Sequence, residues 1–263
     1  MKILKKSSIV SFFSLFAVNF VDMRMIVKDK FINAVTLSIP LLFTGTYMLQ
    51  FYGVNNEYGI FQAASVIGMI ISMAATGFLV DFVLKIETKE VEYYSLLPIP
   101  FWGYCLQIIF FYTFYCFVMS IAAILSTILV LYGKNIFAGL SLFKFITVIL
   151  FAGCLNSSFV LFLSSYAKGH EDIEKIILRI TVPLSFLGGH QYSWYNLFSF
   201  NKFLGYLNLL NPYTYITEAI RSAMISTEGN MPSSISIPAM ACFAVIFFIL
   251  AVRKLKKKLD LTY

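Results

Sequence analysis

The sequence predicts an all-α polytopic membrane protein, and three observations lead to this prediction. Hydrophobic residues make up 59% of the 263 residues and charged residues only 13%, about half of the ~25% that is typical of soluble domains. The mean hydropathy is +0.81. Several apolar runs reach the ~20 residues that a helix needs to cross a bilayer. This composition excludes a soluble globular domain, a disordered chain and a nucleic-acid-binding domain.

We predict six transmembrane helices in a single transmembrane domain that comprises residues 1–263. The spans are expected at residues 31–52, 60–84, 101–132, 137–165, 173–189 and 234–252. The third span is longer than a perpendicular crossing requires, so it must tilt or project from the membrane. The first five spans occupy residues 31–189, and the last span with a basic tail occupies residues 234–263. Within the fourth span, the polar atoms of the stretch Asn156-Ser157-Ser158 are expected to form hydrogen bonds across helices.

The positive charges predict how these spans are oriented. The net charge is +7, and Lys and Arg together number 20. Only Lys134, Lys202 and Arg221 fall on one predicted side, Lys144 lies within the fourth span, and the remaining sixteen fall on the other side. Since Lys and Arg accumulate in cytoplasmic loops, both termini are predicted to be cytoplasmic. The expected location is a bacterial-type inner (cytoplasmic) membrane.

Residues 1–30 are expected to form a cytoplasmic arm and a helix that lies in the membrane interface. Residues 9–28 mix aromatic and aliphatic side chains with Asn19, Asp22, Arg24 and Lys28, which favours an amphipathic helix. A seventh crossing is the alternative, and it would break the charge asymmetry. A removed signal peptide is not expected, because the stretch has no small-residue cleavage site.

The region between the fifth and sixth spans is unusually aromatic. Residues 183–224 contain ten Phe, Tyr and Trp residues, while Gly188 and Gly189 interrupt one helix and Asn211–Pro212 begins another. The segment is too apolar for a solvated loop and too interrupted for one helix. We interpret it as a re-entrant helical pair in the outer leaflet, with residues 190–233 as a candidate lid or gate, because non-helical backbone at that depth must be covered or line a cavity.

No catalytic, cofactor or metal site is predicted. The chain contains no G-x-x-x-x-G-K-[S/T] phosphate loop, and neither His170 nor His190 has the spacing of a metal ligand. The four cysteines all lie in apolar runs, where we interpret them as small buried hydrophobes. The acidic cluster at residues 171–174 is interpreted as a charged turn before the fifth span.

One motif precedes the last span. Residues 211–221 read Asn-Pro-Tyr-Thr-Tyr-Ile-Thr-Glu-Ala-Ile-Arg. Pro212 suits the first turn of a helix, and Glu218 and Arg221 share one helix face. The pair either fixes the lid or docks a neighbouring subunit, or it is an ordinary surface pair. If the two side chains pair, exchanging them should restore function that either single reversal removes. The stretch resembles the N-P-x-T-Y-x-x-E-A-x-R pattern of ABC transporter permeases of the type-2 exporter class.

A second stretch, residues 87–100 after the second span, is similar to the coupling segment of the same family. It is acidic and ends in Leu and Pro, although Lys89 and Glu90 stand where the family usually has Gly-Thr. A short charged helix at this place suits a socket on a motor protein, and Pro98 would set its exit angle. We predict that the segment faces the ATPase through these residues: Glu87, Glu90, Glu92, Tyr93 and Pro98.

The resemblance implies a membrane-spanning permease subunit that exports an amphiphilic, lipid-linked or drug-like substrate by alternating access. ATP and magnesium would then bind to a separate ABC ATPase chain, so this chain is expected to be neither an enzyme nor a cofactor carrier. A permease dimer is implied, with the same chain or with a related one. The lid residues that the resemblance and the helix breaks suggest are Gly188, Gly189, Asn211, Pro212, Glu218 and Arg221.

The alternative is a membrane protein that works without a motor, either a secondary carrier or an integral lipid-modifying enzyme. A carrier should have ionisable groups in the middle of its spans, and an enzyme should have His, Asp or Glu clustered at one interface. Neither pattern is present. Arg179, about two turns into the fifth span, either contacts an anionic substrate headgroup or marks the membrane edge.

Overall fold

The computed structural model describes residues 31–32, 34–36, 38–42, 57–95, 99–130, 140–225 and 229–259. All regular structure within these ranges is helical. The expected interfacial helix in residues 1–30 lies outside the described residues, as do Pro98 and residues 33, 37 and 43–52 of the first predicted span. The described part of residues 31–42 is helical.

Four helices are long and apolar enough to cross a membrane. They are α2 (Glu57–Glu87), α4 (Phe101–Val130), α5 (Leu142–Ser164) and α11 (Ser233–Lys258). These helices coincide with the second, third, fourth and sixth predicted spans. The exact count of six spans therefore stays a prediction, because the first and fifth do not appear as long regular helices within the described residues.

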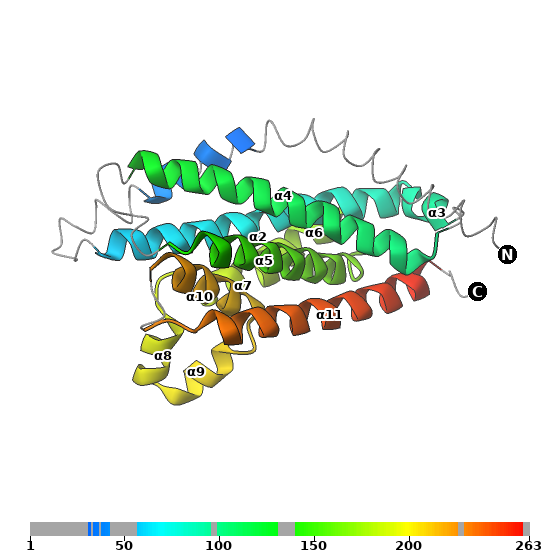
Figure 1. Cartoon of the computed structure of the whole chain (residues 1–263). Coiled ribbons are helices and arrows are strands. Elements are labelled where there is room, and N and C mark those ends of the chain that lie inside the picture. The colour runs from blue at the N-terminus through cyan, green and yellow to red at the C-terminus, as the bar shows by residue number, and fades with distance from the viewer. Residues whose placement is uncertain are drawn as a thin grey trace, which may run out of the picture.

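The centre of the bundle is α5, which packs against α2, α4 and α11 (Figure 1). Of the most apolar 18-residue stretch of α5, 67% is buried inside the structure, whereas the corresponding share for α11 is 28%. The approach of α5 to α4 is close at Gly153, where a Cβ atom would lie 3.1 Å from the carbonyl oxygen of Thr113. A small residue at this point therefore lets the two helix backbones approach.

The fifth predicted span is helical but is not one regular α-helix. It consists of α6 (His170–Ile176), a π-helical turn η3 (Ile177–Thr181) and α7 (Val182–Leu187). The backbone N–H of Val182 donates to the carbonyl of Ile177, five residues earlier. Pro183 explains the change, since it has no N–H to donate to the carbonyl of Arg179, four residues before it.

The aromatic segment folds into three further helices, α8 (Trp194–Phe200), α9 (Lys202–Asn208) and α10 (Pro212–Met224). Side chains of Ser193, Asn201 and Asn211 cap their N-termini, which explains why three short helices begin where they do. Figure 1 shows this group at the end of the bundle opposite α3 (Glu90–Ser95) and the C-terminus. The segment therefore contains three helices rather than the predicted pair, and its re-entrant position in a membrane stays a prediction.

Candidate functional site

Every residue of α10 is buried, and its two charged side chains form an ion pair. Glu218 and Arg221 are each 0% exposed, with 3.2 Å between Glu218 Oε1 and Arg221 Nη1. Of the two readings of the motif, the structure excludes an ordinary surface pair. A buried charge is costly unless its remaining hydrogen-bonding capacity is also satisfied, so the other partners of these two groups matter.

Arg221 binds the loop that joins α7 to α8. Its Nη1 donates to the carbonyl of Tyr192 at 2.8 Å, and its Nη2 donates to the carbonyls of Gly189 and His190. Nη2 also donates to Ser65 Oγ on α2 at 2.6 Å. The guanidinium thus holds an irregular stretch of backbone against the bundle, and it satisfies carbonyl groups that no helix satisfies.

The guanidinium also stacks on an aromatic ring. Arg221 Cζ lies 3.7 Å from the centroid of the Phe61 ring on α2, a distance that is favourable for a cation–π contact. Next to it, Gln62 Nε2 donates to Gln191 Oε1 at 3.0 Å. Three residues of the first turns of α2, Phe61, Gln62 and Ser65, therefore face the 188–193 loop.

Glu218 binds backbone on both sides of α10. Its Oε1 accepts from the backbone N–H of Trp194 at 2.8 Å, and its Oε2 accepts from the backbone N–H of Met231 at 2.9 Å. Glu218 therefore ties the start of α8 to the segment that leads into α11. A carboxylate can only accept hydrogen bonds and a guanidinium group can only donate them. Accordingly, Glu218 binds backbone N–H groups and Arg221 binds backbone carbonyl groups.

The start of α10 holds the end of α7. Asn211 Oδ1 accepts from the N–H of Tyr213 at 3.0 Å, while its Nδ2 donates to the carbonyl of Leu184 at 2.7 Å. Thr217 Oγ1 donates to the carbonyl of Gly188. We call Asn211, Thr217, Glu218 and Arg221 the α10 cluster, since all four bind backbone of residues 184–194.

The two glycines of the predicted lid have different reasons to be glycine. A Cβ atom at Gly188 would lie 2.6 Å from Tyr213 Cβ, so the side chain of any other residue would collide with α10. Gly189 has φ +87°, a left-handed conformation that favours glycine. Together they allow the chain to leave α7 and turn directly beneath α10.

A chain of hydrogen bonds extends from α10 into the bundle. The Tyr213 hydroxyl donates to Asn156 Oδ1 on α5 at 3.1 Å, and Asn156 Nδ2 donates to the carbonyl of Ile71 on α2 at 2.6 Å. The expectation of hydrogen bonds across helices is confirmed for Asn156, whereas Ser157 Oγ has no hydrogen-bond partner among the described residues.

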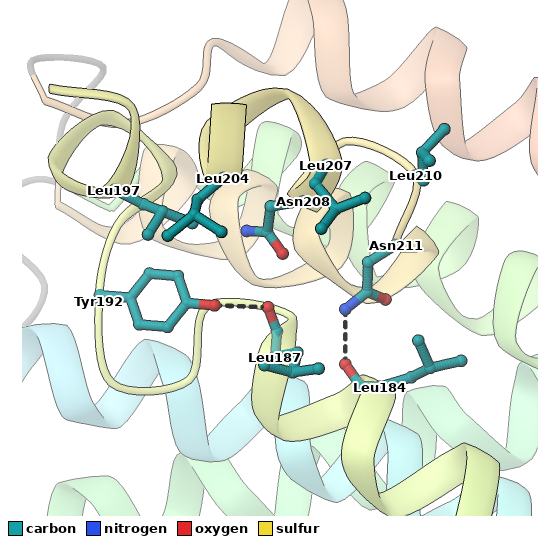
Figure 2. Close-up of a pocket in the computed structure, with 9 residues that line it drawn as sticks. All are labelled: Leu184, Leu187, Tyr192, Leu197, Leu204, Leu207, Asn208, Leu210 and Asn211. Carbon is teal, nitrogen blue, oxygen red and sulfur yellow. Dashed lines mark hydrogen bonds between the residues drawn. The ribbon is translucent and has the colours of Figure 1, made fainter. Parts of the chain in front are cut away.

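A pocket lies between α7 and the α8–α9 pair (Figure 2). Its volume is about 510 Å³. Its wall is almost entirely apolar and is formed by six leucines, one tyrosine and two asparagines: Leu184, Leu187, Tyr192, Leu197, Leu204, Leu207, Asn208, Leu210 and Asn211. No sequence signal pointed to this pocket, because leucines of an apolar segment are expected anywhere in a membrane protein.

The predicted coupling residues lie at the other end of the molecule. Glu90 begins α3 and pairs with Lys85 at 3.8 Å, and both side chains are partly exposed. Glu92 is exposed, whereas Val91 between them is fully buried and anchors α3. Tyr93 lies in α3.

Glu87 forms a hydrogen bond within the protein that the sequence did not predict. Its carboxylate accepts a hydrogen bond from the backbone N–H of His170, the first residue of α6, and so joins the end of α2 to the start of α6. Nearby, the pKa of the Asp172 carboxyl is lowered because the backbone N–H of Lys168 and the Lys175 side chain donate to it. Whether Glu87 also contacts an ATPase stays a prediction.

Arg179 lies in the η3 turn with its side chain exposed. Its assignment to a substrate headgroup stays a prediction. Within the described residues, no three His, Cys, Asp or Glu side chains come together in a way that would hold a metal ion. Sequence reasoning missed Phe61, Gln62 and Ser65, although the polar pair Gln62 and Ser65 in an apolar run was an available signal.

The family model for the ABC-2 type transporter matches residues 10–225. The chain belongs to the ABC-2 type transporter family. No similar curated protein and no similar solved structure was found. The match extends over the described spans α2, α4 and α5, the predicted coupling segment and the α10 cluster, and it ends just before α11. This ABC-2 chain is therefore a membrane-spanning permease subunit of an ABC transporter.

Proposed function

We propose that this ABC-2 permease exports an amphiphilic, lipid-linked or drug-like substrate by alternating access, driven by ATP that a separate ATPase chain hydrolyses. A pair of permease chains would form the pathway. The observation that carries the proposal is a single helical path between the two ends of the molecule. This path consists of residues 170–187. At its start, the backbone N–H of His170 donates to Glu87, and directly after its end the carbonyl of Gly188 accepts from Thr217 of the α10 cluster.

This path supports coupling because a displacement of α3 and the end of α2 would move α6 directly. The displacement would then pass through η3 and α7 to the 188–193 loop, because these two elements follow α6 directly along the chain. Hydrogen bonds from Arg221 hold this loop against α10, so a displacement of the loop would act directly on the contacts of the α10 cluster.

Purification tests whether an ATPase accompanies the chain. Tagged chain would be purified in mild detergent from its native host, and the proteins that accompany it would be identified.

The exposed acid Glu92 is the best position to test the motor contact. Glu92→Lys should lower ATP-driven transport at unchanged membrane abundance, because it reverses a charge on the short helix proposed to meet the ATPase. Lys257→Glu is the control, since it also reverses an exposed charge but lies on α11, which is not part of the proposed path.

Two results would contradict the proposal. One is full transport by Glu92→Lys together with its ATPase. The other is purification of the chain alone in a detergent that preserves a known transporter of this type.

A further inference from the structure

The pocket between α7 and the α8–α9 pair contains one polar group that the protein leaves unused. Its volume of about 510 Å³ falls within the ~300–1,000 Å³ of small-molecule sites. Figure 2 shows two polar side chains engaged by the wall: the Tyr192 hydroxyl donates to the carbonyl of Leu187, and Asn211 Nδ2 donates to the carbonyl of Leu184, each at 2.7 Å.

The third polar side chain is Asn208, which is only 8% exposed. Its Nδ2 has no hydrogen-bond partner among the described residues, and Figure 2 shows its amide projecting among the leucines of the pocket. A buried donor without an acceptor costs free energy. A lone water would be a poor solution, because a buried water needs two to four polar partners and the side chains of this wall offer one buried polar atom without a partner.

A ligand for this pocket needs an apolar body and one uncharged acceptor near its end. The wall contains no Lys or Arg, so nothing in it would neutralise a buried carboxylate or phosphate. The rim is open and apolar, since Leu187, Leu207 and Leu210 are 58%, 52% and 72% exposed. A chain from the surrounding membrane would enter over this rim without crossing polar surface.

We propose that this pocket binds one acyl chain of a bilayer glycerolipid, whose ester carbonyl accepts a hydrogen bond from Asn208 Nδ2. The bound chain would fill the space between α7 and α9 and support the 188–193 loop. The site does not depend on transport or on an ATPase, and its ligand is a resident lipid rather than the exported substrate.

The test compares lipids with and without the carbonyl. Purified full-length chain in detergent would be titrated with diacyl phosphatidylcholine and with its dialkyl ether analogue of equal chain length, and native mass spectrometry would count the lipid retained. We expect one ester lipid per chain to bind roughly five- to tenfold more tightly than the ether lipid, as one buried hydrogen bond allows. Asn208→Leu should abolish this preference.

Asn208→Leu keeps the backbone carbonyl that accepts from Thr214 Oγ1, so α9 retains its link to α10. Leu204→Trp should fill the pocket and remove the retained lipid. Leu129→Trp, at an equally apolar position that is 66% exposed on α4, should keep it. A diazirine in the middle of the acyl chain should cross-link to α7 or α9.

Equal affinity of the wild-type chain for the ester and ether lipids would overturn the proposal, whatever the variants do. Retention of the lipid by folded Leu204→Trp would also overturn it. Both readouts are made without ATP, so failure of this inference leaves the exporter proposal standing, and failure of the exporter proposal leaves this inference standing.

Discussion

Arg221 is held mainly by backbone carbonyls, and this determines how its variants behave. Arg221→Met removes the donor for Gly189, His190 and Tyr192 and leaves Glu218 buried without its cation. We expect a loss of about 3–5 kcal/mol in the free energy of unfolding, seen as a lower thermal midpoint in detergent. Arg253→Met, at an exposed position, is the control and should leave the midpoint unchanged.

The same geometry corrects the expectation for exchanged charges. In the double variant Glu218→Arg/Arg221→Glu, a carboxylate would face the carbonyls of residues 189–192, and a guanidinium would face the N–H groups of Trp194 and Met231. We therefore expect no rescue, although the two side chains do pair. Recovery of folded protein in the double variant, relative to either single reversal, would show that the pair matters more than its backbone partners.

Gly188 carries a purely steric constraint. Gly188→Ala places a methyl group 2.6 Å from Tyr213 Cβ, and we expect a loss of about 1–3 kcal/mol in stability, as is usual for overpacking. Gly103→Ala is the comparison and should be close to neutral, because a Cβ atom there would meet only side-chain atoms, the nearest at 3.3 Å. If thermal unfolding showed Gly188→Ala to be neutral, the close approach of α7 to α10 would be wrong.

The sequence predicted the relative position of Glu218 and Arg221 but not their surroundings. Three-residue spacing predicted that Glu218 and Arg221 share a face, because that follows from helix geometry alone. It did not predict their burial, since Ser65, Trp194 and Met231 approach them from distant parts of the chain. The number of partners of a buried charge depends on tertiary contacts that no local pattern encodes.

At the scale of elements, one side-chain link joins three helices. Tyr213→Phe removes the hydrogen bond from α10 to Asn156 on α5, while the Asn156 bond to α2 remains. We expect a loss of about 1 kcal/mol, measured as a lowered thermal midpoint. Tyr195→Phe, at a residue that is 57% exposed, should have no effect. An equal shift in both variants would contradict a structural role for the Tyr213 hydroxyl.

The fifth predicted span shows where element prediction fails. Gly188–Gly189 indicated correctly that the helix ends there, because glycine opposes regular helix. The π-turn at residues 177–181 was not predicted, since it depends on how the carbonyl of Arg179 that Pro183 leaves free is accommodated by the packed chain. The caps of α8, α9 and α10 were more predictable, since Ser and Asn favour that position.

For the whole molecule, hydropathy predicted the long helices well. The predicted spans at residues 60–84, 101–132, 137–165 and 234–252 match α2, α4, α5 and α11 closely, because a run of ~20 apolar residues leaves few alternatives. The arrangement of these helices around α5, and the place of α10 against them, were not predictable, since apolar surfaces of helices are chemically alike.

The orientation of the molecule gives a direct test. In a chain whose four cysteines are replaced by Ala, Lys202→Cys should react with a membrane-impermeant maleimide in intact cells, and Lys168→Cys should react only after permeabilisation. Both lysines are exposed, so reactivity reports the side of the membrane rather than burial. The reverse pattern would place the termini outside, and labelling of both in intact cells would contradict the span assignment between them.

The α10 cluster also dictates an order of assembly during synthesis. A ribosome completes the 188–193 loop and the α8–α9 pair before it reaches Arg221, and Met231, which binds Glu218, follows still later. The nascent chain must therefore carry an unbound irregular segment until about thirty further residues have been made. Because chains emerge from the N-terminus onward, a chain that stops between residues 194 and 221 lacks the groups that hold this segment, and it is a natural target for membrane quality control.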